Sequence, residues 1–340
     1  MSIINYFVPL HRFKYQTTME KQDDLSLIKA RSYRSVLKAG FQLYTGNFRR
    51  IFKASWQMVL LYALICGALG TLTSIKLPEI TLAVMQQLSA MQGISMETAK
   101  QYGGTLIAIP ALSLLAIATI SLASATILNK LKEHKETGII SAPPHWLTAS
   151  PRLMGRTLKG VFLTLAIMLI PLLLFIGLLA VADQLSPQFT IRHLNTVIVA
   201  FFVCTVIALL FALPLMYVLM KYLMEAPCGY WATLCHNYGR GMCHWGFLFL
   251  VFFVSTLLVE ILALIIIMPA NILSFANQQA HQGLLIGDPL GMPSYMTSLT
   301  FATFMLCCFI QFYVTQVTLV HNYYIYGSIE TNDYEKNTLH

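Results

Sequence analysis

Six long apolar stretches divide the chain, and each is long enough to cross a lipid bilayer as a helix. A span needs about 20 apolar residues to cross about 30 Å of hydrocarbon. In lipid every backbone polar group must be paired, and a barrel would instead show alternating strands of about ten residues. The pattern predicts an all-α, polytopic transmembrane bundle within residues 41–325, with spans at 58–75, 105–128, 160–181, 196–220, 246–268 and 299–320.

The segments on either side of this membrane domain are more polar. Residues 326–340 form a predicted cytoplasmic tail, and residues 1–40 form a predicted cytoplasmic N-terminal segment. From Leu25 to Gly40 a helical period sets basic residues on one face and apolar residues on the other, with Asp24 as N-cap. This pattern predicts an amphipathic helix on the membrane surface, with a solvated cytoplasmic helix as the alternative. No removable signal peptide is predicted.

The spans alternate in a way that suggests three helical hairpins. A basic and aromatic lead-in with an Arg beside a Gly precedes the first, third and fifth spans. Each is followed by an outgoing span, an outer loop and a returning span, so we expect three degenerate repeats. The alternative is that any membrane chain alternates basic entries with spans. Gly67 and Gly70 predict close helix packing in span one.

The outer loops differ in kind. Between spans one and two, helical spacing of Ile80, Val84, Leu88 and Met91 predicts a short amphipathic helix. Between spans five and six, the glycines and prolines from Gly283 to Pro293 predict an irregular connection.

Composition and charge agree with a membrane location. Fifty-seven per cent of the residues are hydrophobic and 11 per cent are charged, which is too little polar surface for a soluble globule. Of the 22 Lys and Arg residues, 19 lie on the side that holds both termini, which is therefore predicted to be cytoplasmic. The net charge of +8 suggests attraction to anionic lipid rather than nucleic-acid binding. The residues expected to contact anionic lipid are Arg31, Arg34, Lys38, Arg49 and Arg50.

Glu260 is the most unusual residue, because it lies inside the fifth span. It precedes Pro269 by nine residues, which places it roughly 13 Å from the expected outer end of its helix. A charge at that depth is costly, so the carboxyl group should be protonated, hydrogen-bonded or exposed to a wet cavity. The expected partner is Gln311 in span six, on a polar stripe with Cys307 and Thr315. Either Glu260 forms a proton-, cation- or headgroup-linked site, or it joins helices five and six as a neutral structural contact.

Other chemistry is weakly represented. The segment CGYWATLCHNYGRGMCH offers cysteines and histidines but lacks a CxxC clamp, so we expect interfacial packing and no metal site. Seven cysteines imply no disulfide framework. The sequence contains no GxSxG, HExxH or P-loop motif and no paired carboxylates, so neither an enzyme nor a cofactor is predicted. Pro110, Pro171 and Pro214 lie inside spans and predict kinks.

The lead-in GFQLYTGNFRRIFKASWQMVLLYALICGALG and the ending NYYIYGSIE flank the six spans. Together they resemble a diffuse group of bacterial six-helix inner-membrane proteins, similar to the membrane domain joined to some glycerophosphodiester phosphodiesterases. The resemblance implies an integral domain of the bacterial inner membrane without an established activity. It carries over no functional residue, and the phosphodiesterase catalytic domain has no counterpart in this sequence.

These observations predict a non-enzymatic membrane scaffold or accessory subunit that binds lipid. Its expected partners are membrane lipids and other membrane-protein subunits, with no nucleic acid. The alternative is a small transporter or permease subunit using Glu260 and the polar face of the sixth span. A lipid-modifying enzyme is the third candidate.

Overall fold

The computed structural model describes residues 26–89, 96–141, 150–185, 194–225, 229–286 and 293–338. Within these residues the fold is all-α, and six helices are long and apolar enough to cross a membrane. The helices are α2 (Tyr33–Thr71), the π-helix η2 (Leu72–Lys76), α3 (Leu77–Ser89), α4 (Met96–Thr137), α5 (Pro151–Leu185), α7 (Leu194–Met224), α8 (Tyr230–Cys243), α9 (Trp245–Ile286) and α10 (Met296–Thr338).

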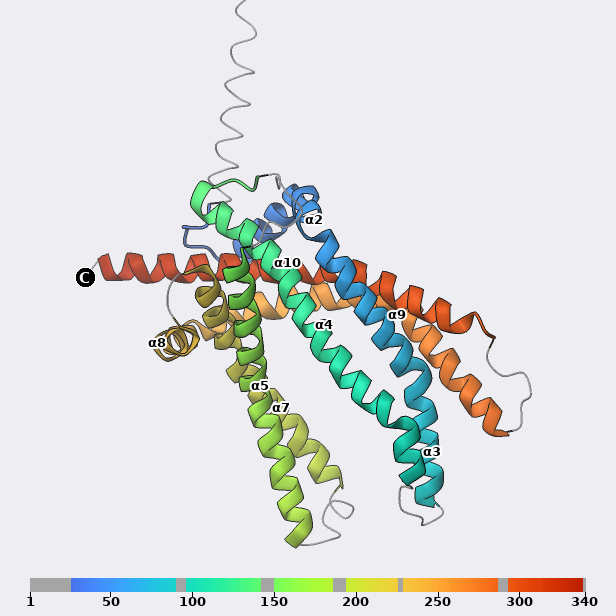
Figure 1. The fold of residues 1–340 in the computed structure, drawn as a ribbon. Helices are drawn as coiled ribbons and strands as arrows, with labels where there is room; N and C mark the ends of the chain where they lie inside the picture. Colours follow the sequence, from blue (N-terminus) through green and yellow to red (C-terminus); the bar gives the residue numbers. More distant parts are fainter. Residues whose placement is uncertain are drawn as a thin grey trace, which may run out of the picture.

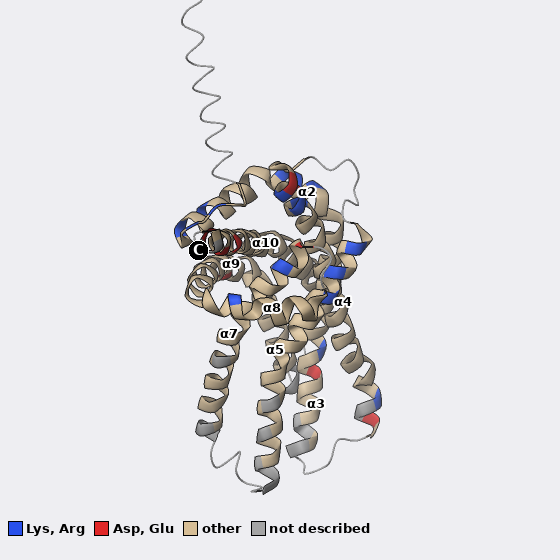
Figure 2. Ribbon diagram, turned by 90° about the vertical axis from the view of Figure 1, so that its left-hand side faces the viewer, with Lys and Arg blue, Asp and Glu red and all other residues tan. Residues whose placement is uncertain are grey.

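The spanning helices pair as three hairpins, α2 with α4, α5 with α7, and α9 with α10. The hairpins diverge from a common region, which we call the junction end; the opposite end is the tip end. In Figure 1, α4, α5 and α7 run downward while α9 and α10 run to the right. Figure 2 views α9 and α10 nearly end-on, with part of α2 above them and α3, α5 and α7 extending below, and shows Lys and Arg concentrated around the junction end. The predicted all-α fold with six candidate spans is therefore confirmed.

Helix α2 replaces two elements that the sequence pattern separated. It runs unbroken from Tyr33 to Thr71, whereas residues 26–32 are not helical. The predicted surface helix from Leu25 to Gly40 is therefore wrong in its boundaries, and its proposed cap at Asp24 lies outside the described residues. The reason is packing: Val36, Ala39 and Leu43 are buried in the protein core, and α2 packs along α10. A core-facing stripe continues the helix through the basic lead-in.

Helix α9 also extends beyond its predicted limit. It passes through Pro269 and Gly283 to Ile286, so the helix end expected at Pro269 and the start of the irregular segment expected at Gly283 are both wrong. Residues 287–292 of that segment lie outside the described residues. Ala270 and Asn277 are fully buried beyond the proline, so tertiary contacts hold the extension in place. Pro110, Pro171 and Pro214 likewise lie within α4, α5 and α7. Lipid-facing helices tolerate proline when neighbouring elements stabilise the freed carbonyl.

The predicted helix of the first outer loop is confirmed as α3, which follows directly from α2 through η2. Met91, its last predicted apolar position, lies outside the described residues. The predicted close packing of span one is also observed. A Cβ atom on Gly70 would lie 2.3 Å from the Phe304 ring, and one on Gly67 would lie 3.1 Å from the carbonyl oxygen of Phe301. Helix α10 therefore approaches α2 at the level of its backbone.

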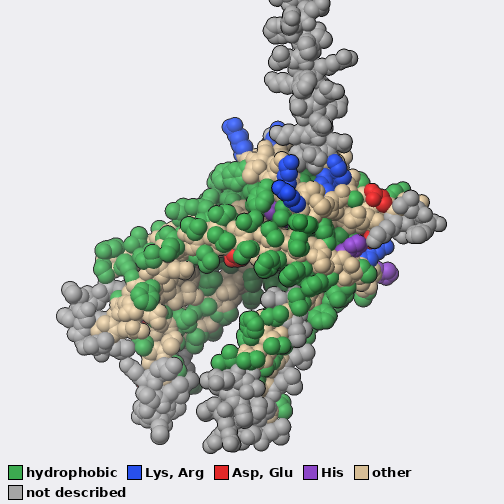
Figure 3. Space-filling model, turned by 180° about the vertical axis from the view of Figure 1, so that it is seen from behind, with side chains coloured by type: hydrophobic (Ala, Val, Ile, Leu, Met, Phe, Trp, Pro, Cys, Tyr) green, Lys and Arg blue, Asp and Glu red, His purple; other side chains and the backbone are tan. Residues whose placement is uncertain are grey.

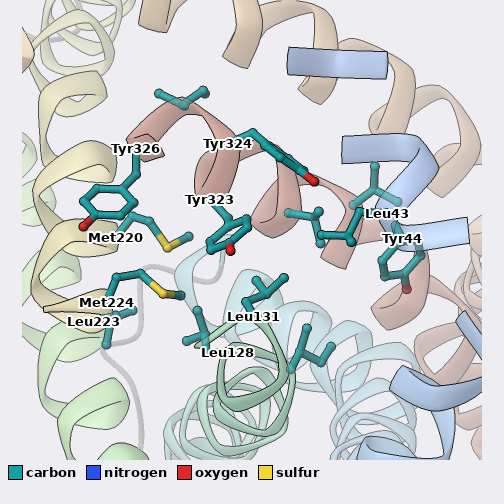
Figure 4. Packing of buried hydrophobic residues seen from close by; sticks show 14 of the residues in the cluster. Leu43, Tyr44, Leu128, Leu131, Met220, Leu223, Met224, Tyr323, Tyr324 and Tyr326 are labelled. Carbon is teal, nitrogen blue, oxygen red and sulfur yellow. The ribbon is translucent and has the colours of Figure 1, made fainter. Parts of the chain in front are cut away.

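The hydrophobic core lies at the junction end and is organised around the second half of α10. Tyr323, Tyr324 and Ile325 are almost completely buried there. Figure 4 shows that nearby side chains of α10 contact different helices: Tyr323 points toward Leu131 of α4, and Tyr326 lies beside Met220 of α7. A single helix thus fills the space between elements from all three hairpins.

Candidate functional site

At the junction end, charged and tyrosine side chains form hydrogen bonds and an ion pair that connect α4 and α7 to α10. The Nζ atom of Lys221 lies 2.6 Å from Oε1 of Glu330, and the Tyr217 hydroxyl donates to the same oxygen at 2.5 Å. Tyr326 donates to Glu225 at 2.8 Å and accepts from Lys135 at 3.0 Å. These side chains come from α4, α7 and α10 and from the residue that follows α7. We call them the junction network, and its geometry suits holding helices together.

Arg31 belongs to the protein interior. Its side chain is 7% exposed, and its guanidinium donates to the Ser26 carbonyl at 2.5 Å and lies 4.9 Å from the centre of the Tyr324 ring. Its backbone N–H donates to Ser328 Oγ at 2.9 Å. The prediction that Arg31 contacts lipid is therefore wrong, because the residue precedes α2 and is directed onto α10.

The other predicted lipid contacts lie on the surface of α2. Arg34, Lys38, Arg49 and Arg50 are all exposed. At 100° per residue, Arg34, Lys38 and Arg49 share one helix face. Arg50 lies off this face, and its guanidinium donates to the Ile140 carbonyl. Figure 3 shows Lys and Arg side chains projecting at the junction end above a mainly hydrophobic surface. The basic face of α2, defined by Arg34, Lys38 and Arg49, thus borders the apolar exterior.

Glu260 does not face the protein interior. Its side chain is exposed, and the surrounding positions Phe253, Leu257 and Leu264 on α9 are exposed apolar residues. Within the described residues no hydrogen bond or ion pair involves Glu260. The stripe that α9 buries lies on a different face and includes Val251, Ser255, Val259 and Ala263. The expectation that Glu260 joins helices five and six is therefore wrong.

The residues predicted to accompany Glu260 are placed elsewhere by the register of the last hairpin. The antiparallel pairing sets Ser255 beside His321 and Asn277 beside Thr300. Extending that register places Glu260 about six residues, or roughly 9 Å, along the axis from Gln311. Cys307 is buried against the backbone of Ala270, and the Thr315 hydroxyl donates to the Phe312 carbonyl at 2.8 Å. The predicted site does not assemble, because Glu260 lies on the exposed face of α9 and is offset along the axis from Gln311.

A buried histidine that sequence reasoning missed bridges three helices. His321 of α10 is 1% exposed, and its Nε2 lies 3.3 Å from the Leu37 carbonyl of α2. Since a carbonyl only accepts, Nε2 carries the proton and Nδ1 accepts from the hydroxyl of Ser255 at 2.5 Å. The ring sits over Gly40, where a Cβ atom would lie 2.2 Å from it. The predicted sixth span ended at residue 320, so a histidine within the helix went unnoticed.

A groove lined by hydroxyl, amide and apolar side chains separates η2 and α3 from the last part of α9, toward the tip end. It has a volume of about 550 Å³. Its lining residues are Thr73, Ser74, Leu77, Pro78, Thr81, Leu82, Ser274, Gln278 and Gln282. Beside it, fully buried Asn277 donates through Nδ2 to Ser74 at 2.9 Å and to Thr300 at 3.2 Å. We call this the η2–α9 groove.

The cysteine and histidine segment forms α8, which packs against α7. Cys235, His236 and Cys243 are exposed, and Cys228 lies outside the described residues. Tyr230 anchors the helix by hydrogen-bonding Thr164 at 2.7 Å, and burial raises the pKa of its hydroxyl. Across the described parts of the chain, no three His, Cys, Asp or Glu side chains are grouped closely enough to hold a metal ion.

In comparisons with known proteins, no family model, no curated protein and no solved structure matches this chain.

Proposed function

We propose that this chain is a non-enzymatic accessory subunit of the bacterial inner membrane, which binds another membrane protein through α9 and anionic lipid through α2. The junction end then faces the cytoplasm, in accord with the excess of Lys and Arg there. The observation that carries the proposal is the outward position of Glu260 on an apolar helix surface. The resemblance to six-helix inner-membrane proteins stays a prediction.

An ionisable side chain facing lipid is expensive, which is why such residues usually face a protein interior or a wet cavity. Placing a carboxylate at the centre of a spanning helix costs about 2.5–3.5 kcal/mol on insertion scales. Glu260 receives no compensating hydrogen bond within the described residues. A partner helix that offers a hydrogen-bond donor or a cation to Glu260 would cover the carboxyl group and offset this cost. The exposed residues Phe253 and Leu264 would pack against the same partner.

The alternative function, a small transporter, has weaker support. Such a transporter would need Glu260 and the polar face of the sixth span to line one path. The α9–α10 register instead separates Glu260 from Gln311, and Thr315 uses its hydroxyl on its own helix. Glu260 also lies 18 residues, or about 27 Å, from Gln278 in the η2–α9 groove. No common polar path joins these groups among the described residues.

Replacing Glu260 with leucine tests the subunit proposal. We expect the purified chain in detergent to keep or raise its Tm, because the substitution removes a carboxyl group that makes no internal bond. In cells, a photo-crosslinking amino acid at Leu264 should capture a specific membrane protein when Glu260 is present and lose that product in the Glu260→Leu background. The measurements are thermal denaturation by circular dichroism and identification of the crosslinked product by mass spectrometry.

Leu258, exposed on the opposite flank of α9, is the matched control position for the photo-crosslinker. Equal capture from Leu258 and Leu264 would indicate random encounters in the membrane. A clear fall in Tm for Glu260→Leu would restore the view that Glu260 holds this chain's own helices together. Loss of proton-coupled flux in proteoliposomes with unchanged stability would favour the transporter.

The lipid contact is tested by neutralising the basic face of α2. In the variant Arg34→Gln/Lys38→Gln/Arg49→Gln, the rise in Tm caused by adding phosphatidylglycerol to the detergent-solubilised chain should largely disappear. Each basic side chain near an anionic surface contributes about 1 kcal/mol. The control is Lys76→Gln/Lys100→Gln, which removes cations outside the junction end. If phosphatidylglycerol stabilises the triple variant as much as the parent chain, α2 is not the lipid contact.

A further inference from the structure

We infer that the η2–α9 groove is a binding site for a neutral, polyhydroxylated group such as a sugar ring. This site is independent of Glu260 and of the proposed partner surface. Its volume of about 550 Å³ lies within the ~300–1,000 Å³ typical of small-molecule sites. No assignment made from the sequence included it.

The backbone beside the groove adopts a costly local conformation. The π-helix η2 spans Leu72–Lys76 between two α-helices. Short π-helical turns are rare in proteins, and those that occur are often found at functional sites. The Thr73 hydroxyl donates to the carbonyls of Leu69 and Gly70, at 2.9 and 3.1 Å, and so stabilises the altered turn. The π turn brings Ser74 against α9, where Asn277 binds it. The groove wall is thus built by a specific departure from α-helix.

Two buried polar atoms with no partner in the described ranges lie next to the groove, on the face of α9 adjacent to its lining residues. Asn277 is fully buried, and its Oδ1 atom has no hydrogen-bond partner among the described residues. The Nε2 atom of His281, one helical turn further along α9, is also buried and without a partner in that part of the chain. A buried polar atom left without a bond costs about 1–3 kcal/mol, which is a reason to expect a ligand or water at such a place.

The chemistry of the lining selects the ligand class. The polar lining consists of the hydroxyls of Thr73, Ser74, Thr81 and Ser274 and the amides of Gln278 and Gln282. Among the residues that the structure describes, no charged side chain lines the groove. The nearby charge of Lys76 is already paired with Glu79 at 2.9 Å. The Thr73 and Thr81 hydroxyls donate to backbone carbonyls and offer an acceptor to a ligand. The amides of Gln278 and Gln282 can both donate and accept, and this mixture matches a sugar or polyol rather than an anion. Leu77, Pro78 and Leu82 supply an apolar wall for the carbon face of a ring.

Depth in the membrane bears on the source of this group. Ser274 lies six residues, or about 9 Å along the helix, beyond the apolar run that ends at Met268, and Gln282 lies about 21 Å beyond it. The headgroup layer occupies about 5–8 Å on each side of the hydrocarbon. On this reckoning the groove would begin near the headgroups and extend toward water, where either a glycolipid headgroup or a free sugar could enter.

The test uses the full chain purified in an amine-oxide detergent, which carries no sugar, or placed in nanodiscs. One arm adds glucosyl diacylglycerol to the nanodiscs, and the second adds methyl glucoside or maltose to the detergent sample. We expect a rise in Tm with at least one of these sugar probes; the first arm alone would identify a lipid headgroup as the source. Phosphatidylglycerol serves as an anionic comparison and should not compete with the sugar.

Matched variants separate the groove from the rest of α9. The variant Gln278→Leu/Gln282→Leu should weaken binding of the effective probe at least tenfold with an unchanged Tm in its absence. Gln279→Leu, at an exposed position on a different helix face, should keep affinity within twofold. Absence of binding by every sugar probe, equal losses in both variants, or displacement of the sugar by phosphatidylglycerol would overturn the assignment.

Discussion

Removing the positive charge at Lys221 should destabilise the junction end more than any other single charge change that we predict. In Lys221→Met, the Tyr217 hydroxyl would be the one partner left to Glu330 within the described part of the chain. The Lys221 side chain is 9% exposed and that of Glu330 is 29% exposed, so water replaces the lost contact only in part. Breaking a buried ion pair costs about 3–5 kcal/mol, and the partial exposure of Glu330 lowers our expectation to about 2–4 kcal/mol.

Thermal denaturation in detergent measures this effect, and two further variants interpret it. Lys221→Met/Glu330→Leu should recover part of the loss, because Glu330 is then no longer an uncompensated charge. Glu225, which lies 3.8 Å from Lys221, keeps its hydrogen bond from Tyr326. The exposed pair Lys76–Glu79 has a similar N–O distance of 2.9 Å but exposes 48% and 33% of its side chains. Lys76→Met should therefore change stability by less than about 1 kcal/mol. Equal effects of Lys221→Met and Lys76→Met would contradict a buried structural role for the junction network.

Adding one methyl group at Gly40 should disrupt the buried bridge formed by His321. The new Cβ atom would lie 2.2 Å from the imidazole ring, which is held by Ser255 on one side and by Leu37 on the other. The ring can move only by losing those hydrogen bonds. Overpacking in a close-packed core costs about 1–3 kcal/mol, so we expect Gly40→Ala to lose about 2 kcal/mol despite alanine's better helix propensity.

Gly46 in the same helix is the matched control, since nothing lies within 4 Å of its Cβ position. Gly46→Ala should be neutral or stabilise the chain by up to about 1 kcal/mol, because only the helix propensity changes. In a His321→Ala background, Gly40→Ala should cost much less than it does in the parent chain. The measurement is the denaturation midpoint of the parent chain, Gly40→Ala, His321→Ala and the double variant. If Gly40→Ala costs the same stability in both backgrounds, His321 is not the obstacle.

The class of protein followed from the sequence because hydrophobicity and chain length act locally. Lipid requires every span to satisfy its own backbone, so a long apolar run already specifies a helix. The three hairpins followed from the same rule and from the alternation of basic entries. The small-residue positions Gly67 and Gly70 were also correctly interpreted, because a missing side chain is itself the condition for close approach.

The exact ends of helices did not follow, because packing overrides local signals. Pro269 and the glycines after it normally indicate a helix end, yet buried Asn277 and Ala270 hold α9 together to Ile286. The candidate site did not follow either, because Glu260 lies on the exposed face of α9 and is offset along the axis from Gln311.

Sequence by itself determined that the chain is a multi-span helical membrane protein with a basic end, because those properties sum over many residues. Only the tertiary structure decided which way particular side chains face. It placed Glu260 outside and Arg31 inside, and it brought together Ser74 and Asn277, which are 203 positions apart in the chain. Which face of a helix is buried depends on which neighbouring helix packs against it. That information resides in contacts between distant segments, which no local pattern of residues records.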